Sequence, residues 1–167
     1  MEYQIKKVSC DNMDFKNFCV KLDDFQNNIF PERAKLGFTA LAGLEKFQVI
    51  LVLYDNEKAI ACASLRPVNE TTCEIARLYI DEIHRGKGLA KILVNKIIES
   101  AIESGYEKMI LDTLKDSISA RVLYEKMGFV EIPVFDIDTL KNSFSTDDEE
   151  RIKKIQKFYV FMEKNIA

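Results

Sequence analysis

Residues 74–90 read EIARLYIDEIHRGKGLA, and this stretch decides the fold. Its first half has the β-branched and aromatic residues of a buried strand, and its second half is a turn that opens a long helix. The turn carries the pattern Arg85-x-x-Gly88-x-Ala90, in which the small residues let the backbone approach a ligand closely. Free N–H groups at the helix start favour an anion, and Arg85 and Lys87 add positive charge. The stretch therefore predicts a phosphate site, with a diphosphate as the expected ligand.

This short pattern has a second interpretation, because it also occurs by chance in chains of this length. The alternative is a tight strand-to-helix turn with a solvated basic rim. Two other phosphate motifs are absent from the sequence: the GxxxxGK[ST] loop of nucleoside triphosphate sites and the GxGxxG fingerprint of dinucleotide sites.

Working outward, apolar periodicity predicts a mixed α/β fold in one domain, residues 1–167. Where a helix links two strands, those strands are expected to be parallel. A polar stretch, Asp136–Gln156, is expected to hold one short surface helix, because acids precede bases in its second half. The expected strands are Tyr3–Val8, Phe47–Tyr54, Ala59–Leu65, Cys73–Ile80, Met109–Leu114, Val130–Val134 and Phe158–Glu163. The other expected helices are Asp14–Phe25, Pro31–Gly43, Gly88–Ser104 and Ser117–Met127.

The composition excludes several classes of protein. The chain has 167 residues, 47% hydrophobic and 31% charged, which excludes a disordered tail and a small disulfide scaffold. A net charge of −3 argues against non-specific nucleic-acid binding. No apolar run approaches the about 18 residues of a membrane helix. Met1–Tyr3 shows no basic-then-apolar signal pattern, so we expect the cytoplasm.

Metal and triad chemistry are also disfavoured. The four cysteines show no CxxC spacing, and His84 is the single histidine of the sequence. A zinc site needs four well-spaced ligands, so no metal is expected. We expect the cysteines to be reduced and His84 to be a rim residue.

A second segment, residues 117–129, strengthens the interpretation of the turn Arg85–Ala90 as a binding site. Residues 117–129, SISARVLYEKMGF, resemble the A-x-x-L-Y-E-K-x-G-F signature of the GNAT superfamily of N-acetyltransferases. The turn Arg85–Ala90 is similar to that superfamily's (Gln/Arg)-x-x-Gly-x-(Gly/Ala) acetyl-CoA loop. The resemblance is close over about residues 60–134 and rests on element order elsewhere.

The resemblance implies a GNAT-like central twisted mixed sheet, with helices on both faces and a V-shaped opening between strands four and five. Acetyl-CoA would enter that opening, and the backbone of Leu78, Tyr79 and Ile80 would pair with its pantetheine arm. The diphosphate would lie on the N–H groups of the turn and helix start. Ser117, where the family often has Asn, could contact the cofactor arm. The cofactor-binding residues implied by the resemblance are Leu78, Tyr79, Ile80, Arg85, Gly86, Lys87, Gly88, Leu89, Ala90 and Ser117.

Acetyl transfer to an amine requires a base, an acid and a donor to the oxyanion. Glu74 lies where several family members carry a catalytic glutamate, and we expect it to act as the base through a water. The alternative is that Glu74 faces solvent at the start of its strand, and Glu82 ranks lower as a base. Tyr124, a phenol that carries a proton at neutral pH, is the expected acid. The backbone N–H of Leu78 is the expected oxyanion donor.

Three further residues carry weaker expectations. Arg77 alternates away from Leu78, so it is either structural or placed to meet an acidic acceptor. Tyr106 and Tyr159 are expected to pack in the core.

No motif names the acceptor. A primary amine on a small molecule, such as an amino acid or a polyamine, is the leading interpretation, and a protein N-terminus or lysine is next. Other classes also stay open: an acyl-CoA-binding sensor without turnover, and a nucleotide-binding α/β domain. We expect no nucleic-acid or membrane partner, and the resemblance implies a homodimer as one oligomeric state.

Overall fold

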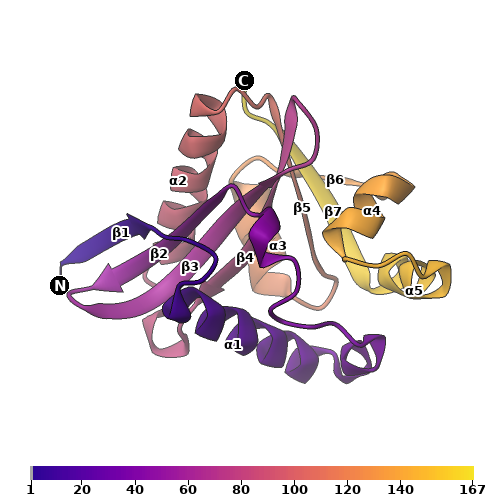
Figure 1. The fold of residues 1–167 in the computed structure, drawn as a ribbon, viewed down its shortest axis with the longest axis horizontal. Helices are drawn as coiled ribbons and strands as arrows, with labels where there is room; N and C mark the ends of the chain where they lie inside the picture. Colours follow the sequence, from indigo (N-terminus) through magenta and orange to yellow (C-terminus); the bar gives the residue numbers. More distant parts are fainter. Residues whose placement is uncertain (1) are drawn as a thin grey trace.

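A single seven-stranded sheet runs through the computed structural model, which describes residues 2–167 (Figure 1). The strand order is β1-β2-β3-β4-β5-β7-β6, and only the β4–β5 pair is parallel. Met1, the first residue of the segment considered for a signal, lies outside the described residues. The strands are β1 (Tyr3–Lys7), β2 (Val49–Asp55), β3 (Lys58–Pro67), β4 (Thr72–Ile80), β5 (Lys108–Leu114), β6 (Val130–Ile132) and β7 (Tyr159–Asn165).

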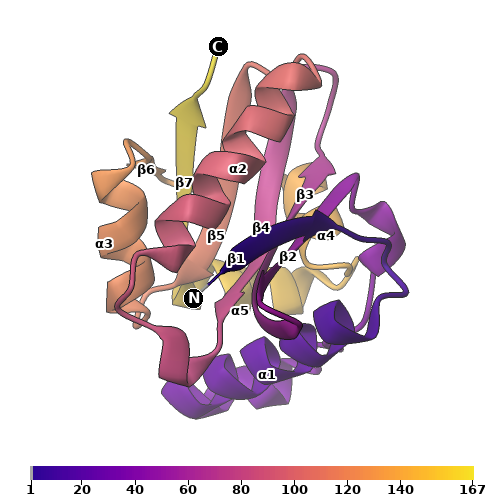
Figure 2. The ribbon, with the colours of Figure 1, turned by 90° about the vertical axis from the view of Figure 1, so that its left-hand side faces the viewer.

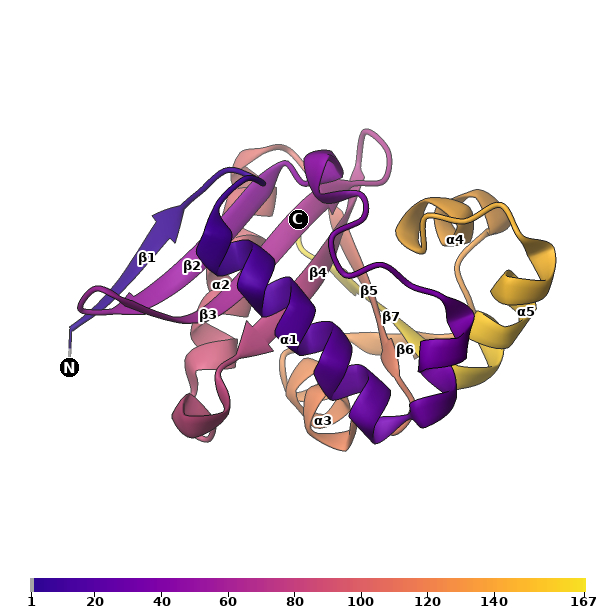
Figure 3. The same cartoon turned by 60° about the horizontal axis from the view of Figure 1, so that its bottom comes forward.

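Helices cover both faces of this sheet. Alternate residues of β2 belong to different clusters: Leu51 and Leu53 pack with α2 (Leu89–Glu103), whereas Ile50 and Val52 pack with α1 (Met13–Ile29). Because side chains alternate across a strand, the two helices lie on opposite faces. In Figure 3, α1 passes in front of β2, β3 and β4 and α2 lies behind them, and Figure 2 shows α2 in front with α1 along the lower edge.

The C-terminal half of the sheet follows the same rule. In β5, Met109 and Leu111 join the cluster of α2 and α3 (Ile118–Lys126), whereas Ile110 and Leu114 pack with α4 (Ile137–Ser143) and α5 (Glu149–Phe158). Therefore α4 and α5 cover β5 and β7 on the face that α1 covers over β2–β4. Figure 3 shows α1 across the middle of the view and the α4–α5 pair to its right.

Strands β4 and β5 separate soon after they meet. Their ladder joins only Thr72–Glu74 to Lys108–Ile110. Beyond it, β4 continues against β3 alone, and a bulge at Arg77, with φ +57°, shifts the register. A bulge bends a strand and increases its twist, so it helps to carry β4 away from β5. The expected opening between strands four and five is confirmed.

Two expected helices were wrong in their extent. Residues 31–43 were expected to form one helix, but the 3₁₀ segment Pro31–Leu36 ends at Gly37, which adopts φ +69°. This left-handed conformation stops a helix, and the chain continues in turns to a second 3₁₀ segment, Leu44–Lys46.

The polar stretch after β6 holds two helices rather than one. Both α4 and α5 bury apolar side chains against the sheet, Leu140 from α4 and Ile152 and Ile155 from α5. The charge order that predicted a surface helix describes only the outer face of α5. Each of the two helices begins at an aspartate, Asp136 or Asp148, whose side chain accepts first-turn N–H groups.

Candidate active site

The turn between β4 and α2 is an open, positively charged loop. Gly86 and Gly88 have φ values of +77° and +79°, a conformation that residues with a Cβ rarely adopt. A Cβ at either glycine would meet no atom within 4 Å. Gly88 is the N-cap of α2, and no side chain caps this helix start. Its first N–H groups are thus left for an anion to use.

Arg85 is held beside this turn by its own contacts. Its Nε donates to the Ile80 carbonyl at 3.0 Å, and its guanidinium lies over the rings of Phe25 and Tyr79, 4.6 and 5.4 Å from their centroids. Lys87 lies on the same turn and is exposed, and Ala90 is the second residue of α2 and is half-buried. The side chain of Leu89 is buried in the core, so only its backbone can face a ligand.

His84 differs from its expected place at the rim. Its side chain is only 8% exposed, and Nδ1 is buried with no hydrogen-bond partner among residues 2–167. The histidine closes a single 3₁₀ turn, Glu82–His84, that directs its side chain inward while Glu82 stays exposed. Neither residue lines the cavity described next.

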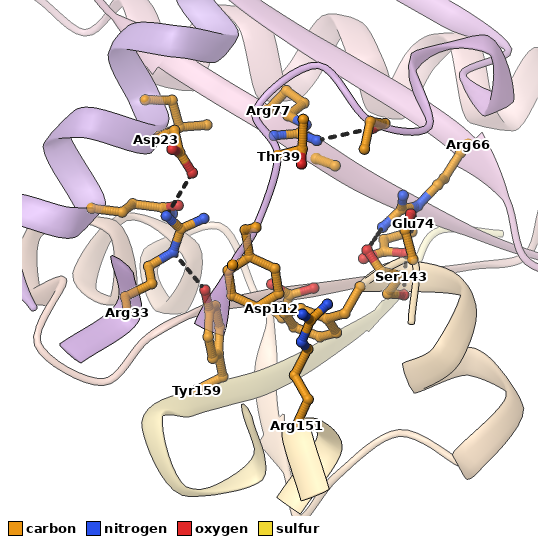
Figure 4. Close-up of a pocket in the computed structure, with 18 of the residues that line it drawn as sticks. Asp23, Arg33, Thr39, Arg66, Glu74, Arg77, Asp112, Ser143, Arg151 and Tyr159 are labelled. Atoms are coloured by element: carbon orange, nitrogen blue, oxygen red, sulfur yellow. Dashed lines mark hydrogen bonds and ion pairs between the residues drawn. The ribbon is translucent and has the colours of Figure 1, made fainter. Parts of the chain in front are cut away.

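A polar cavity of about 210 Å³ lies where β4 and β5 separate, on the face that α1 and the α4–α5 pair share. Figure 4 shows side chains from all of these elements converging on it. Four arginines line this cavity, which we call the arginine cavity: Arg33, Arg66, Arg77 and Arg151. Three carboxyl groups accompany them: Asp23, Glu74 and Asp112.

Glu74 is buried in the wall of the arginine cavity. Its side chain is 1% exposed, so the interpretation that it faces solvent is wrong. Oε2 accepts hydrogen bonds from Arg66 Nε at 2.9 Å and from Ser143 Oγ at 2.7 Å. Oε1 is buried and has no donor among residues 2–167. The same three side chains also border a second hollow of about 410 Å³.

Asp112, on β5, faces Glu74 across the opening. Burial raises the pKa of Asp112 well above its ordinary value, and the negative charge and hydrogen bond of Glu74 raise it further. Arg66 and Arg77 act in the opposite direction. Two carboxyl groups so placed favour a state in which one of them holds a proton.

Tyr124 lies on the other side of the sheet opening, in the core with α2 and α3. It is 6% exposed, and its ring meets that of Phe129 edge-on, with 5.6 Å between centroids. Burial raises the pKa of Tyr124, and Asp112 adds to the effect. The phenol keeps its proton at any physiological pH, as a general acid requires. Tyr124 does not line the arginine cavity, whereas Asp112, which contributes to the raised pKa of Tyr124, does.

The arginine cavity contains residues that sequence reasoning missed. Arg33 is buried, pairs with Asp23 at 2.6 Å and donates from Nε to Tyr159 Oη at 3.0 Å. The expectation that Tyr159 and Tyr106 pack in the core is confirmed, and Tyr159 in addition lines the arginine cavity. A signal existed for Asp112 alone, because a carboxylate inside the apolar strand MILDTL is costly without a purpose.

The remaining expected residues lie near the opening. Tyr79 and Ile80 pair with β3 on one side, and β5 has already left the other side. Leu78 lies in the bulge between paired positions of β4. Ser117 is the N-cap of α3, and its hydroxyl makes no capping hydrogen bond. Among residues 2–167, no cluster of His, Cys, Asp and Glu could hold a metal ion, and no helix is long and apolar enough to cross a membrane.

Known proteins share both this sequence pattern and this fold. Human N-acetyltransferase 8 is 33% identical over 90 residues, which cover 51% of this chain and 40% of that protein. Human N-acetylaspartate synthetase is 35% identical over 80 residues, which cover 48% of this chain and 26% of that protein. The matched region thus spans less than half the length of these curated relatives.

A solved structure agrees over nearly the full chain. A GNAT family acetyltransferase from Elizabethkingia anophelis, with acetyl-CoA bound, has a TM-score of 0.66 and 17% identity, and covers 98% of this chain and 97% of that one. The model of the Acetyltransferase (GNAT) family matches residues 20–129, which include the glycine turn, the bulged strand and the helix that carries Tyr124. The chain belongs to the GNAT family of acetyltransferases.

Proposed function

We propose that this chain, acting as one domain, is an acetyl-CoA-dependent N-acetyltransferase for a primary amine on a small molecule. One observation carries the proposal: an uncapped, glycine-lined helix start and a polar cavity lie at the same opening of the sheet. Two substrates can therefore approach the separated strands from different sides. The four cysteines are free thiols, which a reducing compartment maintains, so the cytoplasm is the proposed location.

The residues around the opening fit acetyl-CoA. The backbone of Gly86–Ala90 would hold the diphosphate, because the glycine turn is open and the first N–H groups of α2 have no side-chain cap. Arg85 and Lys87 would add positive charge. The backbone groups of Leu78–Ile80 on the side from which β5 has separated would pair with the extended pantetheine arm. Ser117 would contact the same arm from α3.

Before the transfer the acceptor ammonium must lose a proton, and during it the departing sulfur must gain one. An alkyl ammonium has a pKa of about 10, so the acceptor must first lose a proton. Glu74, whose buried Oε1 accepts no hydrogen bond from residues 2–167, would accept this proton by way of water. The amine nitrogen then attacks the thioester carbonyl, the C–N bond forms, and the C–S bond breaks. Tyr124 would give its proton to the departing sulfur, and the second proton of the amine nitrogen, released as the amide forms, would return through water to the phenolate. The Leu78 N–H would stabilise the oxyanion.

A small acceptor suits the size of the arginine cavity. At about 210 Å³ it lies below the roughly 300–1,000 Å³ typical of pockets for drug-sized ligands. One relative is named N-acetylaspartate synthetase, a name that denotes acetylation of an amino acid. A protein N-terminus or lysine is the less favoured acceptor, and a homodimer stays a prediction.

The test supplies acetyl-CoA with a panel of primary amines and follows release of the free thiol. We expect release with at least one amine, and a fall of about 10²–10⁴ in kcat for Tyr124→Phe. The fold should survive this change, because no group of residues 2–167 hydrogen-bonds to Tyr124 Oη and the ring keeps its contact with Phe129. Tight binding of coenzyme A without release on any amine would instead support a sensor, and protection by ATP or NAD alone would support a nucleotide-binding domain.

Glu74 needs a more careful design. Glu74→Gln leaves the buried Arg66 without its partner, and breaking such a pair costs about 3–5 kcal/mol of stability. The double variant Arg66→Gln/Glu74→Gln removes both charges and keeps the two side-chain amides able to hydrogen-bond. A double variant that is folded but inactive would support Glu74 as the base, whereas wild-type turnover would refute that role.

A further inference from the structure

The arginine cavity carries more positive charge than its carboxylates balance. Figure 4 shows its guanidinium groups arriving from different sides of the cavity. Two of the four arginines have a partner: Arg33 pairs with Asp23 at 2.6 Å, and Arg66 pairs with Glu74 at 2.9 Å. These pairs hold the walls in place and occupy two of the three carboxyl groups.

Arg77 is the first arginine without a partner. None of the ion pairs among residues 2–167 includes it, and its one hydrogen bond is from Nη2 to the Ala42 carbonyl at 3.4 Å. Burial lowers the pKa of Arg77, and the positive charges of Arg66 and Arg33 lower it further, whereas Cys19 and Asp23 act in the opposite direction. The bulge places this side chain in the cavity wall although it gains no counter-ion there. A partly buried guanidinium without an ion-pair partner is costly, and an anionic ligand reduces that cost.

Arg151 is the second. It extends from the first turns of α5 into the cavity, where its Nη2 lies 3.2 Å from the point that a Cβ on Gly37 would occupy. None of the ion pairs in the described chain includes Arg151 either. One carboxyl group of the cavity remains, Asp112, and a single carboxyl group cannot balance two arginines. Burial and the negative charge of Glu74 also raise its pKa, which favours its neutral form.

We propose that the acceptor is a small primary amine that carries one or two carboxylates, and that Arg77 and Arg151 bind those carboxylates. The guanidinium fork matches a carboxylate in two parallel hydrogen bonds, which also fixes the orientation of the acceptor. With its carboxylates at these arginines, the acceptor would hold its amine within the same cavity that Glu74 lines. The same field repels a polyamine or a lysine side chain. This inference rests on the proposed function and names its substrate class.

The first experiment compares acceptors that differ only in charge. Thiol release is measured with L-alanine against L-alaninamide, with L-aspartate against L-asparagine, and with spermidine. The expected kcat/KM is tenfold or more higher for the molecule with the additional carboxylate in at least one pair, since a charge-assisted hydrogen bond lost from a buried site has an effect of that size. The amine of an α-amide is the less basic of its pair, so intrinsic reactivity works against this result in the alanine pair.

Variants then assign the preference to the two arginines. Arg151→Gln and Arg77→Gln should each reduce the ratio of kcat/KM between acid and amide by about tenfold. Lys154→Gln is the matched control, because it removes one positive charge from the exposed face of the same helix, and its ratio should equal that of the wild type.

The outcomes separate this inference from the function on which it rests. If amides or spermidine react as well as the acids, the inference is overturned and the acetyltransferase stands. If no amine releases thiol, the proposed function fails, and calorimetry still decides the inference. In that case, L-aspartate must bind the wild type, and its Kd for the Arg151→Gln variant must be at least tenfold higher. Equal binding, or no binding to the wild type, overturns it.

Discussion

Replacing Gly88 by alanine separates the cost of folding from the cost of binding. In the free protein a Cβ at Gly88 meets nothing within 4 Å, so the change creates no clash. What it does impose is a left-handed conformation, φ +79°, on a residue with a side chain. That conformation costs roughly 1–2 kcal/mol. For a chain of this length the expected fall in Tm is about 2–8 °C.

The same substitution should strongly weaken coenzyme A binding. The added methyl group would stand at the mouth of α2, where the diphosphate is proposed to approach the first N–H groups. Loss of one hydrogen bond to a charged group corresponds to about 1.5–3 kcal/mol, or roughly a tenfold to hundredfold rise in Kd. Isothermal titration with coenzyme A measures the Kd, and differential scanning fluorimetry measures the Tm.

Gly105 supplies a matched control at the other end of the same helix. It has φ +89°, and a Cβ there also meets nothing within 4 Å. Gly105→Ala should therefore lower the Tm by a similar amount and leave the Kd unchanged. If Gly88→Ala binds coenzyme A as tightly as Gly105→Ala does, the turn is not the diphosphate site.

Two further predictions follow from buried ionisable groups. Because the pKa of Asp112 is raised in the folded protein, its protonated form supports folding below its ordinary pKa, and this support is lost as pH rises toward the raised value. The free energy of unfolding of Asp112→Asn should thus rise relative to that of the wild type between pH 4 and pH 7, by about 1.4 kcal/mol for each pH unit until the raised pKa is reached. Urea unfolding at both pH values measures this, and an equal difference between variant and wild type at the two would contradict it. Burial raises the pKa of Cys19 to about 11 and that of Cys73 to about 12, so a thiolate-selective alkylating reagent at pH 8 should label only the half-buried Cys10 of the native chain, and mass spectrometry showing modified Cys19 or Cys73 would count against the described packing.

Most of the fold could be predicted from local sequence patterns. The turn at Arg85–Ala90 and the helix before Gly128 could be predicted because their conformations depend on residues close in sequence. Apolar alternation found the strands for the same reason. The prediction of one helix over residues 31–43 was wrong beyond Gly37, because a single left-handed residue ends a helix without altering the apolar periodicity of the sequence.

The acceptor side could not be predicted in this way. Arg33 and Tyr159 are 126 residues apart, and Ser143 meets Glu74 across 69 residues. Each is an ordinary polar residue in its own segment, and its role arises only when the segment Pro31–Leu36 and the helices α4 and α5 pack together over β5 and β7. Sequence reasoning left Arg77 open between a structural role and an acidic acceptor, since its alternation could not reveal the bulge that puts it in the cavity.

The short ladder between β4 and β5 has a consequence for the whole sheet. With only three residue pairs in register, both strands have the character of edge strands although they lie in the middle of the molecule. An exposed edge ordinarily lets another protein chain add itself and aggregate. Here helices on both faces flank the gap, so a molecule as narrow and extended as a single strand is favoured there over another protein. Geometry that is a hazard at a protein's periphery thereby becomes, in its interior, a selector of ligand shape.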